Sequence, residues 1–82
     1  MRVTIRLMCA DLDVPSGSRE IEIAEGATVG QALAEYLSLY PIEDPDGLLP
    51  ESMFLVSKKP AQLDSALREA DELMVMRILH GG

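Results

Sequence analysis

The 82-residue chain is long enough to form one domain with a single modest core, and it is too short for two such domains. Its 48% hydrophobic and 26% charged residues exclude a disordered chain, and no apolar run is long enough to span a membrane. Fourteen acidic and seven basic residues give a net charge of −7, which argues against a nucleic-acid partner. With one cysteine and no start resembling a signal peptide, we expect a single cytoplasmic domain over residues 1–82.

Two alternating segments open the chain. Residues 2–8 and residues 19–24 each alternate between apolar and polar side chains, which predicts two half-buried strands separated by a loop. The predicted inward-facing residues are Val3, Ile5, Leu7, Ile21 and Ile23. If the two strands pair as a hairpin, the arginines of the first strand face the glutamates of the second.

The pattern then changes to the period of a helix. Thr28 followed by Gln31 is typical of a capping box at a helix start, and Pro41 ends the helical pattern. We therefore predict a helix at roughly residues 28–40. Its apolar stripe consists of Val29, Ala32, Leu33, Tyr36, Leu37 and Tyr40.

The second half of the chain contains two more predicted strands. An irregular connection from Ile42 to Ser52 leads to a strand at Met53–Ser57, which is apolar on both faces. A turn follows at Lys58-Lys59-Pro60, and residues 63–67 can form one short helical turn capped by Asp64. The last strand is predicted over residues 73–79.

This order of elements predicts an α+β fold of the β-grasp type, with about four strands in a mixed sheet and one helix on one face. The first and last strands would lie parallel at the centre, and the helix would cover Leu73 and Val75. Met74, Met76 and Ile78 would then point to the uncovered face, with Leu55 beside them. They would form either an exposed apolar patch or a second small cluster.

The sequence ends at Gly81-Gly82, which suggests that the terminal carboxylate is a reactive group. Glycine has no Cβ, so such a tail can pass through a narrow channel in an activating enzyme. A terminal carboxylate is ionised at neutral pH and is a poor electrophile, so it must be activated. We expect the segment from Leu79 to Gly82 to be mobile in the isolated protein, because no apolar side chain anchors the glycines.

Four short motifs together resemble the ubiquitin-like sulfur carriers, namely the small subunit of molybdopterin synthase and the thiamine-pathway sulfur carrier. They are Glu25-Gly26-Ala27-Thr28-Val29, Leu63-Asp64-Ser65-Ala66-Leu67, Asp71-Glu72-Leu73 and Gly81-Gly82. The resemblance covers nearly the whole chain. It departs at two turns, where Ser57-Lys58 and Glu69-Ala70-Asp71 replace glycine-containing sequences, and we expect these turns to use different backbone angles.

The resemblance implies a carrier rather than an enzyme. An E1-like enzyme would adenylate the Gly82 carboxylate with ATP and magnesium, so the carrier itself would bind no cofactor and no metal. A persulfide donor would convert the adenylate to a thiocarboxylate, which would deliver sulfur to a biosynthetic enzyme. Gly81 would share the reactive tail. Independently of the resemblance, the apolar set on the uncovered face predicts that Met74, Met76, Ile78 and Leu79 bind partners. The resemblance does not decide between the molybdopterin and thiamine pathways.

Two other functions stay open: a protein modifier that forms isopeptide bonds through Gly82, and a purely binding β-grasp module. Cys9 is expected to be a small buried hydrophobic residue, and His80 a solvated tail residue. No His, Cys and carboxylate cluster has the spacing of a metal site, and no glycine-rich loop is typical of phosphate binding.

Overall fold

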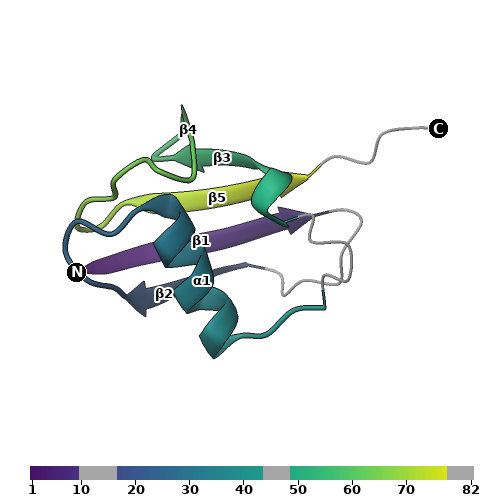
Figure 1. Cartoon of the computed structure of the whole chain (residues 1–82), viewed down its shortest axis with the longest axis horizontal. Coiled ribbons are helices and arrows are strands. Elements are labelled where there is room, and N and C mark those ends of the chain that lie inside the picture. Colours follow the sequence, from purple (N-terminus) through teal and green to yellow (C-terminus); the bar gives the residue numbers. More distant parts are fainter. Residues whose placement is uncertain (10–16, 44–48, 78–82) are drawn as a thin grey trace.

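The computed structural model describes residues 1–9, 17–43 and 49–77, and Figure 1 shows how their elements are arranged. In chain order the elements are β1 (Arg2–Cys9), β2 (Ser18–Glu22), α1 (Val29–Leu39), a short 3-10 helix η1 (Leu49–Glu51), β3 (Met53–Val56), β4 (Lys59–Ala61) and β5 (Glu72–Arg77). Within this part of the chain, no helix is both long enough and apolar enough to cross a membrane.

The strands form one mixed sheet in the order β2-β1-β5-β3-β4. The central strands β1 and β5 are parallel, while the pairs β1–β2, β3–β5 and β3–β4 are antiparallel. Helix α1 crosses one face of this sheet (Figure 1). The predicted β-grasp arrangement, with the first and last strands adjacent, is therefore confirmed.

The sheet has five strands, whereas the sequence predicted about four. The additional strand, β4, occupies the segment that was predicted to be only a turn, and it contains Pro60. Proline cannot donate a hydrogen bond to a neighbouring strand, so its presence argues against a strand in sequence analysis. Here β4 lies at the edge of the sheet, where the missing donor does not interrupt a ladder on both sides.

The core lies between α1 and the sheet face that it covers. The predicted inward residues of β1 and the helical stripe residues Val29, Ala32, Leu33 and Tyr36 are all buried. Leu37 and Tyr40 are half-buried and pack against this core. Ile21 is also buried, but β2 ends at Glu22, so Ile23 lies just beyond the strand and is only half-buried.

The predicted capping box starts the helix. The Thr28 side chain accepts a hydrogen bond from the Gln31 backbone N–H at 3.2 Å, and the Gln31 side chain accepts one from the Thr28 backbone N–H at 2.9 Å. Val29 and Gly30 donate their N–H groups to the carbonyls of Ser65 and Leu63, each at 2.9 Å. The first three helical N–H groups, which have no partner within the helix itself, therefore all have hydrogen-bond acceptors.

The prediction of a short helical turn at residues 63–67 was wrong. This segment instead runs beside the helix start, where Thr28 and Ala66 form an isolated β-bridge. Gly30 allows this close approach, because a Cβ at its position would lie 3.3 Å from the Leu63 carbonyl oxygen. The local apolar spacing of the segment is compatible with a helix, but the segment instead makes one tight turn, closed by a hydrogen bond from the Ser65 N–H to the Gln62 carbonyl, and presents carbonyls to the first N–H groups of α1.

The prediction that the two glycine-free turns use different backbone angles was also wrong. Ser57, Lys58 and Ala70 all have positive φ angles, of 48°, 71° and 67°. Left-handed backbone costs a residue with a Cβ roughly 1–2 kcal/mol. The surrounding hydrogen bonds hold these angles: Ala70 N–H donates to the Arg2 carbonyl at 2.8 Å, and Ser57 N–H donates to the Glu72 carbonyl at 2.8 Å.

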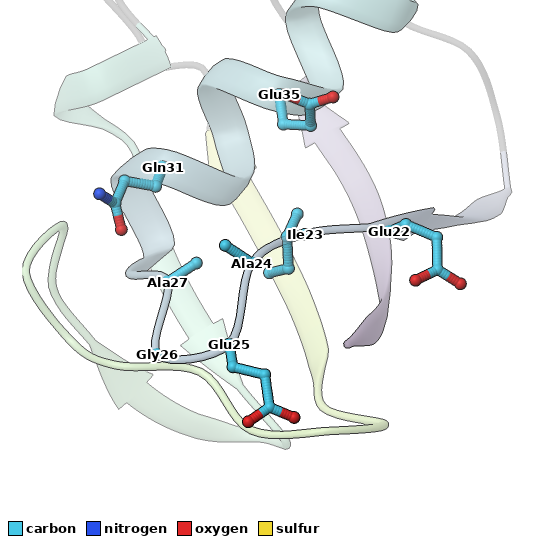
Figure 2. A pocket seen from close by; sticks show the side chains of 8 residues that line it. All are labelled: Glu22, Ile23, Ala24, Glu25, Gly26, Ala27, Gln31 and Glu35. Atoms are coloured by element: carbon cyan, nitrogen blue, oxygen red, sulfur yellow. The ribbon is translucent and has the colours of Figure 1, made fainter.

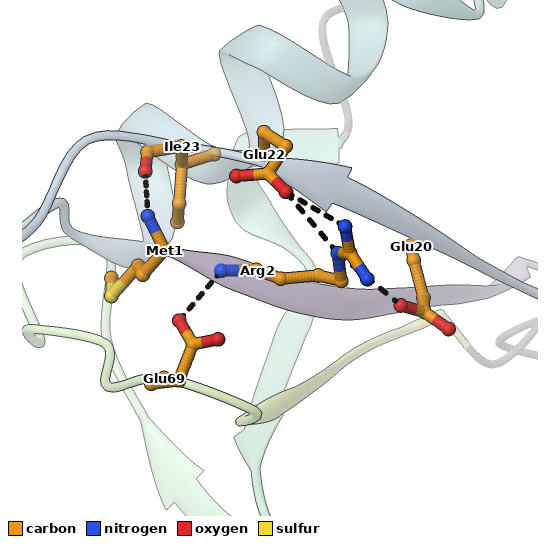
Figure 3. A network of polar contacts seen from close by, with 6 residues as sticks. All are labelled: Met1, Arg2, Glu20, Glu22, Ile23 and Glu69. Carbon is orange, nitrogen blue, oxygen red and sulfur yellow. Dashed lines mark hydrogen bonds and ion pairs between the residues drawn. The ribbon is translucent and has the colours of Figure 1, made fainter.

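The first strand is tied to β2 by the predicted pairing of opposite charges (Figure 3). The Arg2 guanidinium lies 3.1 Å from the Glu22 carboxylate and 3.7 Å from that of Glu20. All three side chains are more than half exposed, so each pair contributes well below about 1 kcal/mol. Just before β1, the Met1 ammonium group donates a hydrogen bond to the Ile23 carbonyl at 2.7 Å.

Candidate functional site: the open face of the sheet

Side chains alternate between two unlike faces along β5. Leu73 and Val75 point toward α1 and are fully buried, whereas Met74 and Met76 point to the opposite face and are half-buried. The alternation of a strand places consecutive side chains on opposite faces. The prediction that Met74 and Met76 lie away from the helix is therefore confirmed.

Strand pairing brings three further apolar residues onto the same face. Met8 of β1 and Met53 of β3 lie directly opposite Met76 on its two sides, and Leu55 of β3 lies opposite Met74. We call this set the methionine face. It consists of Met8, Met53, Leu55, Met74 and Met76.

The methionine face is accessible rather than part of a second core. Met8 is 42% exposed and Met53 is 58% exposed, and no member of the methionine face belongs to the core cluster or packs against it. Methionine is unbranched and polarizable, so it adapts to differently shaped partner surfaces. Of the two interpretations left open by the sequence, the structure favours the exposed patch.

Charged residues occupy the same face beside the apolar ones. Arg6 of β1 lies opposite Met74, and Glu72 lies opposite Thr4, which in turn lies opposite Glu20 of β2. The face is therefore apolar toward the end of β5 and charged toward its beginning. Such an arrangement orients a docking partner, because an apolar centre supplies affinity while the charges select complementary surfaces.

A hollow of about 580 Å³ lies at the other end of the molecule, between the segment after β2 and the start of α1 (Figure 2). Three of its lining residues, Glu22, Glu25 and Glu35, carry exposed carboxylates. Gln31 also lines it, but its side chain is engaged in the capping box. The lining residues contain no nucleophile and base pair, so the hollow does not have the composition of an active site.

Gly26, the glycine of the first resemblance motif, lies in the turn that forms one wall of this hollow. Ala27 N–H donates to the Ala24 carbonyl at 3.1 Å, and Gly26 between them has a φ of 79°. A positive φ at this position is typical of a type II turn and favours glycine. The turn directs the chain into Thr28 and hence into the helix cap.

The predicted tail residues Ile78, Leu79, His80, Gly81 and Gly82 lie outside the described residues, so the structure does not test their predicted roles. Met8 and Met53 were not predicted as site residues. Met8 continues the outward alternation of the first strand, so that signal could have found it. Met53 joins the face only through the register of β3 on β5, which no local pattern encodes.

Two further side chains with reactive groups, Cys9 and Tyr36, belong to the core. Cys9 is 6% exposed, as predicted, and its thiol lies 4.0 Å from the Val75 carbonyl oxygen. Burial raises the pKa of Tyr36 above its ordinary value, and the nearby Arg19 guanidinium opposes this effect. Across residues 1–9, 17–43 and 49–77, no three or more His, Cys, Asp or Glu side chains cluster in a way that could hold a metal ion.

Comparison with solved structures identifies the fold. SAMP1 from Haloferax volcanii superposes with a TM-score of 0.76 and 24% identity over 100% of both chains. A second structure, H. volcanii small archaeal modifier protein 1, gives 0.72 and 21% over 95% of this chain and 98% of its own. The fold is that of the ubiquitin-like β-grasp proteins.

A third β-grasp structure, provisionally named molybdopterin converting factor subunit 1 from Pyrococcus furiosus, has a TM-score of 0.63 and 15% identity over 95% of this chain and 98% of its own. Neither a family model nor a curated protein matches the sequence. The ubiquitin-like fold implied by the resemblance to the sulfur carriers is therefore confirmed by structure rather than by close sequence similarity.

The structure also shows what three of the four resemblance motifs do in this β-grasp chain. The first forms the turn and the helix cap, and the second supplies the carbonyls that receive the helical N–H groups. In the third, the Asp71 carboxylate accepts hydrogen bonds from the Arg68 N–H at 2.8 Å and from the Ser57 hydroxyl at 3.1 Å. These three motifs build the fold, whereas the fourth, Gly81-Gly82, lies outside the described residues.

Proposed function

We propose that this protein is a ubiquitin-like sulfur carrier whose Gly82 carboxylate is activated and converted to a thiocarboxylate that donates its sulfur. The observation that carries the proposal is a ubiquitin-like β-grasp in which Gly81-Gly82 follows shortly after the central strand β5. β5, which ends at Arg77, is hydrogen-bonded to a neighbouring strand on each side. The tail therefore follows a well-anchored strand. Glycine then supplies a segment without side chains that fits a narrow active site.

The proposed chemistry takes place on partner proteins. An E1-like enzyme binds ATP and magnesium and joins AMP to the Gly82 carboxylate, with release of pyrophosphate. A persulfide sulfur of a donor then attacks the carbonyl carbon and displaces AMP. A second thiol of the donor attacks the resulting acyl disulfide, which forms a donor disulfide and leaves the thiocarboxylate on Gly82. The carrier contributes delivery, because tethering the reactive group raises its effective concentration at each partner.

We propose that the methionine face, extended by the tail residues Ile78 and Leu79, docks onto these partners. Its exposed thioethers provide adaptable apolar contacts, while Arg6 and Glu72 provide flanking charges. The net charge of −7 favours basic partner surfaces and disfavours nucleic acid. In this proposal the chain has no active site and no cofactor of its own.

The test is to incubate the purified chain with its E1-like enzyme, ATP, magnesium and a persulfide donor, and to measure the intact mass. We expect the mass to rise by the difference between sulfur and oxygen, with fragmentation locating the change at Gly82. Deletion of Gly82 should abolish the product and leave the fold unchanged, while Cys9→Ala should form the product normally. Sulfur found on Cys9, with Gly82 dispensable, would refute the proposal.

A second candidate is a protein modifier that forms isopeptide bonds through the same activated Gly82. It is favoured by the names of two of the superposed structures, which are archaeal modifier proteins. Both candidates require adenylation, so they differ only in the group that attacks the adenylate. Affinity-tagged chain should be recovered from cells and digested with trypsin, which cleaves after Arg77. An Ile-Leu-His-Gly-Gly remnant on lysines of other proteins indicates a modifier, and a thiocarboxylate without such adducts indicates a carrier.

A further inference from the structure

Three methionine side chains lie in one row across the methionine face. Met8, Met76 and Met53 occupy directly paired positions on β1, β5 and β3, with Met76 in the middle. Met74 lies two residues before Met76 on the same face. Four of the five methionines in the chain are thus gathered on one side of the sheet.

The row has the dimensions of a three-coordinate site. Neighbouring strands lie about 4.8 Å apart, so the Cα atoms of Met8 and Met53 are about 10 Å apart, with that of Met76 between them. Each sulfur is attached through rotatable single bonds, which let the two outer side chains lean over the central one. Met8 and Met53 are 42% and 58% exposed, so reorienting them requires no core rearrangement.

Thioethers bind only a narrow range of metal ions. A thioether sulfur is a soft donor that carries no charge and no proton, so it binds Cu(I) and Ag(I) in preference to hard cations such as Mg²⁺ or Ca²⁺. A site of three neutral donors also suits a monovalent ion better than a divalent one, because the charge brought to the sheet surface is smaller. The net charge of −7 favours any cation, whereas Arg6, two residues before Met8, opposes one.

We propose that Met8, Met53 and Met76 form a three-thioether site for Cu(I) or its analogue Ag(I). The site does not depend on the sulfur-carrier function, because it requires neither Gly82 nor an activating enzyme. Occupation would cover part of the methionine face, so metal binding and partner docking would compete.

The test first removes the single thiol and the single imidazole of the chain, with Cys9→Ala and His80→Gln as the background. The Cys9 thiol is on the helix side of the sheet and 6% exposed, and a thiolate would otherwise compete for the metal. In this background, silver nitrate is titrated into protein carrying ¹³C-labelled methionine methyl groups, in chloride-free buffer. We expect the methyl signals of Met8, Met53 and Met76 to shift together and to saturate at one equivalent, while that of Met1 stays in place.

Affinity for Cu(I) is then measured anaerobically by competition with a colorimetric chelator. Leucine replaces methionine with similar volume but no sulfur, so Met8→Leu, Met53→Leu and Met76→Leu should each keep the fold and weaken binding by about tenfold or more. Met74→Leu is the matched control on the same face and should change the affinity by less than about threefold. Circular dichroism confirms that each variant is folded.

Three results would overturn the proposal. The first is no saturable shift of the three methyl signals at up to several equivalents of silver. The second is a shift of all five methionine methyl groups in parallel, which indicates nonspecific thioether binding. The third is unchanged Cu(I) affinity in folded Met76→Leu.

Discussion

Val75 and Met76 are consecutive residues of β5 on opposite faces of the sheet, so the same substitution should have opposite consequences at the two positions. Aspartate at position 75 would place a carboxylate in the core, where Val75 is 0% exposed. Burying an unpaired charge costs several kcal/mol, and loss of the buried valine side chain adds about 1.5–3 kcal/mol. An 82-residue domain has about 4–12 kcal/mol of stability in total, so Val75→Asp should unfold the chain.

Met76→Asp should be tolerated, because a carboxylate on the methionine face remains hydrated. The cost is only the partial burial of the methionine, about 1 kcal/mol for a half-buried side chain. Binding to the E1-like partner should nevertheless weaken at least about tenfold, or about 1.4 kcal/mol, because the charge lies in the middle of the apolar row.

The assay for this pair is urea unfolding followed by circular dichroism, with calorimetric titration of the E1-like partner for each folded variant. Thr4→Asp provides a matched control, since Thr4 lies on the same face of the neighbouring strand but in the charged region beside Glu72. It should bind within about threefold of the unmodified chain. If Met76→Asp unfolds like Val75→Asp, the methionine face belongs to the core. If it stays folded and binds normally, the methionine face is not the docking surface.

Two further predictions concern strain and ionisation. Ala70→Gly should raise the free energy of unfolding by about 0.5–1 kcal/mol, because relief of left-handed strain at φ 67° exceeds the entropy that glycine adds to the unfolded chain. Urea unfolding measures this, and Ala34→Gly on the exposed side of α1 is the control that should instead lose about 1 kcal/mol; a loss in both variants would contradict the strain argument. Burial raises the pKa of Tyr36, so the folded chain keeps this proton to higher pH than the unfolded chain does. The stabilisation is complete below the unfolded pKa of about 10 and is lost as the pH rises through the folded value. Urea midpoints between pH 9 and 11 should therefore fall more steeply in the unmodified chain than in Tyr36→Phe, and parallel curves would show that another group is responsible.

Much of the β-grasp could be predicted because each of its main elements carries a local periodic signal. Alternation in residues 2–8 and the apolar stripe from Val29 to Tyr40 indicate which face of each element is buried. The capping box of Thr28 and Gln31 indicates where the helix begins. Opposite charges on β1 and β2 likewise predicted their pairing. The periodic features and the helix cap depend on residues within a few positions of one another, and β1 and β2 are consecutive elements, so the order and spacing of residues along the chain contain this information.

Other features depend on contacts between distant segments, and the sequence could not supply them. Residues 63–67 have apolar spacing that fits a helical turn, yet they form a tight turn at Leu63-Asp64 followed by a bridge at Ala66, and they present carbonyls to the start of α1. Ala70 adopts a positive φ that its own chemistry disfavours, because its N–H is held by the Arg2 carbonyl of a distant strand. Pro60 appears in a strand only because β4 ends at the sheet edge.

The candidate site divides in the same way. The sequence by itself determined that Met74 and Met76 share a face and that two glycines follow the last strand, since strand alternation and chain order are local properties. Only the tertiary structure decided that Met8 and Met53 flank Met76. Their proximity comes from the register of three strands that are far apart in sequence, and register is set by which faces the whole core must bury.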